Sequence, residues 1–149
     1  MAHAAVREYD AKQIVYTALE MPYAGHLISN PEVCRALDPQ ISRVVKPDQL
    51  FGKRGKLGLV GVKLTPTQVE EWVNEHMHKE ISIEGVTGKL HTFLVEPFVP
   101  HTQERYISLK ATKTYDELLI SAHGGVDIEE QWEFVHRCEI PLRSLSPEG

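Results

Sequence analysis

The sequence has 149 residues, of which 42% are hydrophobic and 25% charged, a composition typical of one globular domain or of part of a larger one. Its formal net charge of −5 at pH 7 argues against general nucleic-acid binding, which relies on an excess of cations against phosphate. No apolar run approaches the roughly 20 residues of a membrane span, and the two cysteines, Cys34 and Cys138, lie outside any CxxC pair, so we expect a soluble cytoplasmic protein with reduced thiols.

The first predicted helix covers about residues 10–20. Asp10 and Gln13 have the spacing of a helix-capping pair, and apolar residues follow on one face. Residues 22–40 contain three prolines and a glycine, which predicts irregular chain with one short helical turn near 32–37. We therefore expect residues 1–40 to form a helix and an irregular connection.

Two short strands are predicted next, at 41–46 and 57–64, joined by a long loop that begins at Pro47. The strongest helix signal follows. Thr65 suits the N-cap position, Pro66 the first helical position and Gln68 completes a capping box. The apolar stripe of this helix consists of Val69, Trp72, Val73 and His76.

The rest of the chain is predicted to be rich in strands. Strand candidates cover 90–99, 106–110 and 115–122, residues 129–137 suit a short helix or strand, and residues 141–149 read as an unstructured tail. The fold class expected from these elements is α+β, with one main domain over residues 41–140.

The loop between the first two strands concentrates positive charge in an otherwise acidic chain. Its cations are Lys46, Lys53, Arg54 and Lys56, and its glycines are Gly52, Gly55 and Gly58. Glycines let backbone N–H groups approach an anion, and the cations supply countercharge for phosphoryl oxygens. The loop has neither a GxxxxGK[ST] nor a GxGxxG pattern, and a solvated basic hairpin is the alternative.

A second feature is the apolar segment 93–100, which contains Pro97 and Pro100. A strand that stops pairing at a proline leaves backbone groups that can recognise an adenine edge, and Glu104 beyond it is placed for a ribose hydroxyl. Taken alone, the segment also suits an edge strand with a proline bend.

No metal site or catalytic group is assigned from the sequence. His76 and His78 are two positions apart on the predicted helix and face different directions, and HExxH is absent. His123, beside Gly124 and Gly125, suits a turn better than a phosphate contact.

Three stretches together resemble the N-terminal ATP-grasp segment of the ATP citrate lyase family. They are VVKPDQLFGKRGKLGLVGV from Val44, FLVEPFVPHTQ from Phe93 and GGVDIE from Gly124. The opening REYDAKQI also resembles the start of the related succinyl-CoA ligases. The resemblance covers most of residues 5–10 and 41–135 and implies a partial ATP-grasp domain, whose two halves clamp ATP.

By position, the resemblance places Lys46 on the ATP phosphates and Arg54 with Gly55 in a glycine-rich cover. It places the backbone around Pro97 and Val99 on adenine and Glu104 on the ribose. It also implies an enzyme that uses ATP and Mg²⁺ to activate citrate through a phosphorylated histidine and a citryl intermediate, and that makes acetyl-CoA and oxaloacetate with CoA.

The sequence departs from the family pattern in several places. The segment 21–40 is shorter than usual, and His123 stands where relatives often have Glu or Cys. The Asn-Pro strand that helps to hold Mg²⁺ is not matched by Asn30-Pro31, so most Mg²⁺ ligands, the citrate site and the CoA site are expected outside this chain. It would then act with further parts or subunits of the enzyme, and a succinyl-CoA-ligase-like segment or a non-catalytic interaction module are the alternatives.

Overall fold

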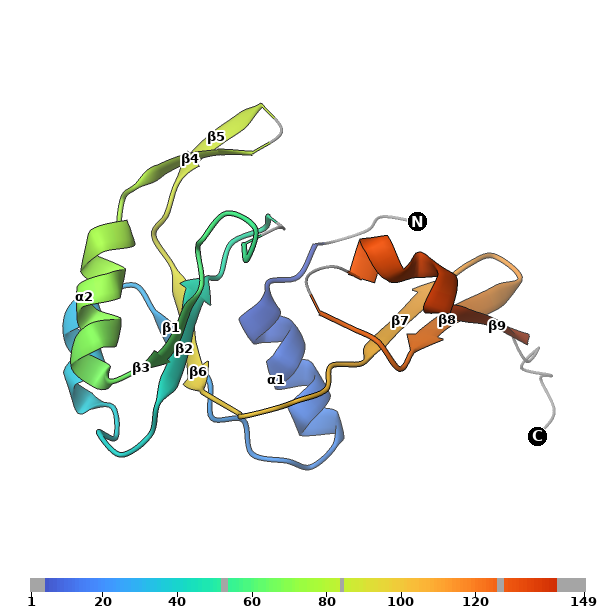
Figure 1. Ribbon diagram of the computed structural model, residues 1–149, viewed down its shortest axis with the longest axis horizontal. Coiled ribbons are helices and arrows are strands. Elements are labelled where there is room, and N and C mark those ends of the chain that lie inside the picture. Colours follow the sequence, from blue (N-terminus) through green and yellow to red (C-terminus); the bar gives the residue numbers. More distant parts are fainter. Residues whose placement is uncertain (1–4, 52–53, 84, 126–127, 142–149) are drawn as a thin grey trace, which may run out of the picture. The chain divides into compact units, whose positions relative to one another are not determined.

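The computed structural model describes residues 5–51, 54–83, 85–125 and 128–141. The chain divides into two compact units, unit 1 over Met1–Val99 and unit 2 over Pro100–Gly149, and each is described by itself (Figure 1). The domain range 41–140 expected from the sequence remains a prediction about the nucleotide-binding region. Within the described ranges, no helix is long and apolar enough to cross a membrane.

Unit 1 combines two α-helices with short strands. In chain order its elements are α1 (Glu8–Ala18), β1 (His26–Ile28), the 3₁₀ helix η1 (Pro31–Ala36), β2 (Arg43–Pro47), β3 (Gly61–Leu64), α2 (Pro66–His76), β4 (Glu80–Ile83), β5 (Val86–Lys89) and β6 (Phe93–Pro97).

Four of these strands form an antiparallel sheet in the order β1-β6-β2-β3. Along β2 and β6, alternate residues point to opposite faces, and the register pairs Val45 with Val95 and Lys46 with Leu94. Val45 and Val95 are fully buried in the core. Lys46 and Glu96, one residue further along each strand, therefore lie on the other face of the sheet.

The hydrophobic core fills the face of the sheet that α2 covers. Val69 and Val73 of α2 are fully buried there with Val45, Phe93 and Val95. Helix α1 lies on the opposite side of the sheet from α2 (Figure 1), where its side chains meet Lys46 and Glu96. One face of the sheet thus packs against the apolar core, and the other presents Lys46 and Glu96.

The helix predicted from Thr65 is confirmed, together with its capping box. The Thr65 hydroxyl accepts the Gln68 N–H, the Gln68 side chain accepts the Thr65 N–H, and Pro66 is the first helical residue. The Asp10 cap predicted for α1 is wrong. That helix begins at Glu8, and Asp10 accepts a hydrogen bond from Arg7 Nε at 3.2 Å instead.

Two predicted strands of unit 1 differ in extent, and three observed strands were not predicted there. The strand expected at 57–64 begins only at Gly61, because residues 54–58 form a turn, and the strand expected at 90–99 is confined to β6. The helical turn near 32–37 is confirmed as η1. The unpredicted elements are β1 and the hairpin β4–β5, which turns at Gly85 with a φ of +83°.

Unit 2 is a three-stranded antiparallel sheet in the order β7-β8-β9 with a 3₁₀ helix. Its elements are β7 (Tyr106–Ala111), β8 (Tyr115–Ser121), η2 (Ile128–Phe134) and β9 (His136–Pro141). The strands predicted at 106–110 and 115–122 are confirmed. The segment 129–137 divides between η2 and the unpredicted strand β9, and of the predicted tail only Pro141 is described, as the end of β9.

Candidate functional site

Lys46 is positioned by the alternation of β2. It lies on the face of the sheet opposite the core, and its side chain is 19% exposed. Its Nζ atom lies 2.5 Å from Glu8 Oε1 and 3.4 Å from Glu96 Oε2. Glu96 directly precedes Pro97 in β6. Lys46, the predicted phosphate ligand, therefore lies beside the strand that leads to the predicted adenine hinge.

Arg54 returns from the loop to the same place. Its Nη1 atom donates to the Pro47 carbonyl at 2.7 Å, and its Nη2 atom lies 2.9 Å from Glu8 Oε2. The first bond closes the loop back onto the end of β2. The structure therefore brings Lys46 and Arg54 together, as one phosphate site requires, although eight positions separate them in sequence.

The group on which the two cations converge is the Glu8 carboxylate, which sequence reasoning missed. Glu8 is the first residue of α1, and its side chain is 21% exposed. Lys12, one helical turn later, lies 2.8 Å from Glu8 Oε1 and also donates to both Glu96 oxygens at 2.8 Å. The i, i+4 spacing of Glu8 and Lys12 is a local signal of an ion pair. The contact of Glu8 with Lys46 instead depends on tertiary packing.

These contacts change the proton affinities of the cluster. Burial by itself raises the pKa of the Glu8 carboxyl, but the hydrogen bonds and charges of Lys12 and Lys46 outweigh it and lower that pKa to about 2. Burial likewise opposes the charged form of Lys12, yet its bonds to Glu8 and Glu96 raise its pKa. Burial and a 3.0 Å hydrogen bond to Glu96 raise the pKa of the Tyr23 hydroxyl. The Glu8 carboxyl and the Lys12 ammonium therefore stay charged near neutral pH, and the Tyr23 hydroxyl stays neutral.

The glycine-rich part of the loop forms a tight turn after Arg54. The Gly58 N–H donates to the Gly55 carbonyl at 3.0 Å, and the Leu59 N–H donates to the Arg54 carbonyl at 2.9 Å. Gly58 has a φ of +67°, a conformation that glycine adopts without strain. Gly52 and Lys53 of the same predicted cover lie outside the described residues.

The predicted hinge follows the end of β6. Strand β1 pairs with β6 only as far as Val95, so Pro97 pairs with Arg43 of β2 alone. The Phe98 N–H still donates to the Ser42 carbonyl at 2.7 Å, so pairing extends one residue beyond the proline. The Val99 side chain is 68% exposed. The backbone recognition of adenine by Pro97 and Val99 remains a prediction.

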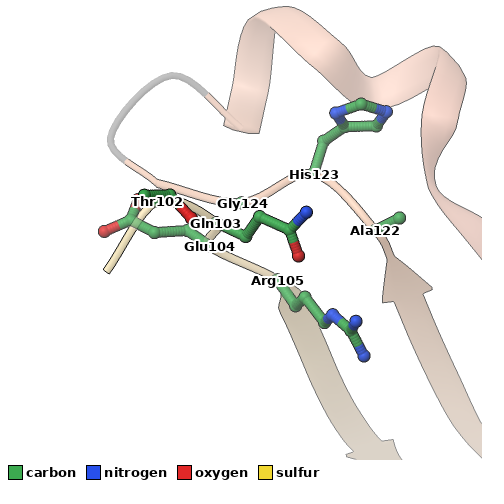
Figure 2. Close-up of a pocket in the computed structure, with 7 residues that line it drawn as sticks. All are labelled: Thr102, Gln103, Glu104, Arg105, Ala122, His123 and Gly124. Atoms are coloured by element: carbon green, nitrogen blue, oxygen red, sulfur yellow. The ribbon is translucent and has the colours of Figure 1, made fainter. Parts of the chain in front are cut away.

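Glu104 belongs to unit 2, where it lines a pocket of about 470 Å³ (Figure 2). Residues of two segments line this pocket: Thr102, Gln103, Glu104, Arg105, Ala122, His123 and Gly124. The carboxylate of Glu104 accepts a hydrogen bond from His101 Nε2 at 3.0 Å. Most of the residues that line the pocket are polar, and the role of Glu104 in holding the ribose remains a prediction.

The turn at Gly124 and Gly125 shapes this pocket. A Cβ atom on Gly124 would lie 2.7 Å from the Arg105 backbone, and one on Gly125 would overlap the Glu104 carboxylate. The His123 imidazole points towards η2 (Figure 2), where its ring lies 5.0 Å from that of Phe134. His123 is thus a packing residue of the turn in unit 2.

A metal centre was not predicted from His and Cys. Among the residues that the structure describes, no group of three or more His, Cys, Asp or Glu side chains is placed to hold a metal ion. Lys46 and Arg54 both contact the Glu8 carboxylate, and the binding of phosphate by these two residues remains a prediction.

Comparison with known proteins decides the family. The sequence profile of the ATP-citrate synthase ATP-grasp domain matches residues 2–148. The chain belongs to this family. Against ATP-citrate synthase alpha chain protein 1 of Arabidopsis thaliana, the chain is 38% identical over 161 aligned positions, which cover 99% of the chain and 38% of that relative.

Two further comparisons agree with this assignment. Human ATP-citrate synthase is 49% identical over 87 positions, which cover 57% of the chain and 8% of the human enzyme. The structure of ATP citrate lyase from Methanothrix soehngenii, in complex with citrate and coenzyme A, superposes with a TM-score of 0.79 at 33% identity, over 94% of the chain and 35% of that protein. The fold is therefore a partial ATP-grasp domain of the α+β class, and the chain spans less than two fifths of the length of these relatives.

Proposed function

We propose that this chain is the ATP-binding N-terminal part of an ATP citrate lyase. The complete enzyme converts citrate, CoA and ATP to acetyl-CoA, oxaloacetate, ADP and phosphate, and we expect this chain to work in the cytoplasm with further parts or subunits that supply the citrate and CoA sites. The observation that carries the proposal is the convergence of Lys46 and Arg54 on one carboxylate. A carboxylate and a phosphoryl group present similar oxygens to such cations.

The proposed nucleotide site has three parts. Lys46 and Arg54 hold the phosphates, with Gly55 in the covering loop. The backbone around Pro97 and Val99 meets adenine. Glu104 binds a ribose hydroxyl from the pocket of unit 2. ATP requires Mg²⁺ for phosphoryl transfer, and we expect most ligands of that ion outside this chain. The described residues therefore bind and orient the nucleotide, and this chain alone is not expected to turn over citrate.

The test is ATP binding by the 149-residue chain, measured by calorimetry with and without Mg²⁺. We expect saturable binding that falls about tenfold or more in Lys46→Ala and in Arg54→Ala, because each substitution removes a charge-assisted hydrogen bond to phosphate. Lys89→Ala is the matched control. It removes the same charge from an exposed position of β5 and should bind ATP as the native chain does.

Thermal unfolding monitored by circular dichroism checks that each variant folds. Native affinity in both folded variants at positions 46 and 54 would remove the phosphate-site assignment. A folded native chain that does not bind ATP would contradict the proposed ATP-binding role.

A further inference from the structure

The cations around Glu8 fall into two groups. Two of them are also proposed phosphate ligands, and the third contacts only carboxylates of the cluster. Lys46 and Arg54 contact one Glu8 oxygen each, and they are also the proposed phosphate ligands. Lys12 contacts both carboxylates of the cluster, Glu8 and Glu96, at 2.8 Å. Three cations, Lys12, Lys46 and Arg54, thus contact the carboxylates of Glu8 and Glu96, and the Asp48 carboxylate accepts the Glu8 backbone N–H.

A triphosphate cannot simply be added to this arrangement. Lys46 and Arg54 already contact Glu8, at 2.5 Å and 2.9 Å, and Arg54 Nη1 also donates to the Pro47 carbonyl. A phosphate brought into the same place would lie beside a carboxylate of the same sign, and the partly buried setting screens that repulsion poorly. Either Glu8 gives up its two cations, or the phosphate binds only weakly.

Lys12 allows Glu8 to give up Lys46 and Arg54. Glu8 and Lys12 are spaced i, i+4 on α1, so their contact depends on neither β2 nor the loop. Glu96 likewise keeps Lys12 and the Tyr23 hydroxyl, which donates to it at 3.0 Å. Both carboxylates therefore retain a partner when Lys46 and Arg54 turn to another anion. An unpaired, partly buried carboxylate would otherwise oppose the exchange.

We propose that Glu8 is a resident counter-anion of the phosphate site, which the nucleotide triphosphate displaces from Lys46 and Arg54 while Lys12 holds the displaced carboxylate. The inference rests on the proposed function and adds a residue that sets its affinity. Nucleotide binding is then an exchange of one anion for another. Glu8 lowers the affinity for triphosphates and keeps the two cations paired before the ligand arrives.

The experiment compares ATP and inorganic tripolyphosphate as ligands of the 149-residue chain, at one fixed ionic strength. Glu8→Gln removes the competing charge, and Glu8→Asp keeps the charge but withdraws the carboxylate by one methylene. We expect both variants to bind either ligand about fivefold more tightly than the native chain. Lys12→Met should weaken the binding of both ligands. Without Lys12, Glu8 has no other cation when Lys46 and Arg54 contact phosphate.

The matched control is Glu70→Gln. Glu70 lies on α2 and pairs with Arg35, so this substitution removes the same charge from unit 1 without touching the cluster. It should leave both affinities unchanged. The Glu8→Asp variant separates contact from charge, because a purely long-range electrostatic effect would leave its affinity at the native value. Circular dichroism establishes that each variant folds before binding is measured.

The outcomes separate this inference from the function on which it rests. If the native chain binds ATP and Lys46→Ala weakens binding, but Glu8→Gln and Glu8→Asp bind no more tightly, the phosphate site stands and the counter-anion role is overturned. Weaker binding by both Glu8 variants would also overturn it, since Glu8 would then orient the cations for the ligand. If neither the native chain nor the Glu8 variants bind either anion, both the proposed function and this inference fail.

Discussion

The Oδ1 atom of Asp48 accepts the backbone N–H of Glu8 at 3.0 Å, across 40 positions of sequence. The same oxygen accepts the Tyr9 N–H at 3.4 Å. The helix therefore takes its cap from a distant residue, because its own N-cap residue, Arg7, makes no side-chain cap bond. Asp48 directly follows β2, at the start of the cation-bearing loop. This cap fixes the end of α1 from which Glu8 reaches Lys46.

Replacing Asp48 should therefore destabilise unit 1. We expect Asp48→Ala to lower the free energy of unfolding by about 1–2 kcal/mol, the usual cost of losing a helix cap. Asp38→Ala is the control, because exposed Asp38 also accepts a backbone N–H, from Gln40 at 2.8 Å, but in a surface turn. Its cost should stay below about 0.5 kcal/mol. Urea unfolding measures both, and equal losses would contradict the capping role.

The Glu8 carboxyl predicts a specific dependence of stability on pH. Its pKa is about 2 in the folded chain, below the ordinary value of 4.5. A carboxyl with a lowered pKa stabilises the fold above the unfolded-state value, and this contribution is lost as the pH falls from about 4.5 towards 2. Near neutral pH it contributes at most about 3 kcal/mol.

Glu8→Gln removes this contribution at every pH. We expect the native chain to be more stable than the variant at about pH 6 and the gap to narrow markedly by about pH 3. Urea unfolding of both chains along this pH series measures the gap. A gap that stays constant with pH would mean that Glu8 stabilises the fold by packing rather than by its charge.

Gly125 should not tolerate a side chain. It has a φ of +101°, and a Cβ there would overlap the Glu104 carboxylate. We expect Gly125→Ala to destabilise the chain by about 1 kcal/mol or more and to displace Glu104. Gly88→Ala, at a site in β5 with open space around the new methyl group, should change stability by less than about 0.5 kcal/mol. Thermal unfolding and the NMR signals of the His101–Glu104 pair report the two effects.

The two cysteines should differ in reactivity. Cys34 is fully buried, and burial, together with the charge of Glu70, raises the pKa of its thiol to about 11. Cys138 is exposed on β9. Since the thiolate is the reactive form, a maleimide near neutral pH should label Cys138 within minutes and Cys34 only after unfolding. Mass spectrometry of the labelled chain, with Cys138→Ser as the control, measures this. Rapid double labelling of the folded native chain would contradict it.

The parts of the fold that were predicted correctly have local causes. The capping box at Thr65 and Gln68 and the apolar stripe of α2 depend on residues within a few positions of one another, so the sequence alone predicts them. The three residues of β1 carry too short a pattern to detect. β1 exists because His26 and its neighbours pair with β6, far along the chain.

The candidate site divides in the same way. The loop that carries Lys46 and Arg54 could be noticed from the sequence because cations and glycines gather in it, and the family resemblance then selected these two residues. Glu8 and Asp48 could not, because their roles arise only when α1 packs against the charged face of the sheet and is capped from the loop. No sequence pattern around Glu8 predicts that its carboxylate contacts Lys46, nearly 40 positions away.

The strand order of unit 1 has a consequence for synthesis of the chain. β6, which lies between β1 and β2 in the sheet, is the last of the four strands to be made. While the polypeptide leaves the ribosome, β1 has no neighbour to pair with, and β2 and β3 can form only a hairpin. The apolar side chains of this half-built sheet stay accessible until residue 97 emerges, which is the interval in which a nascent chain is most prone to aggregate.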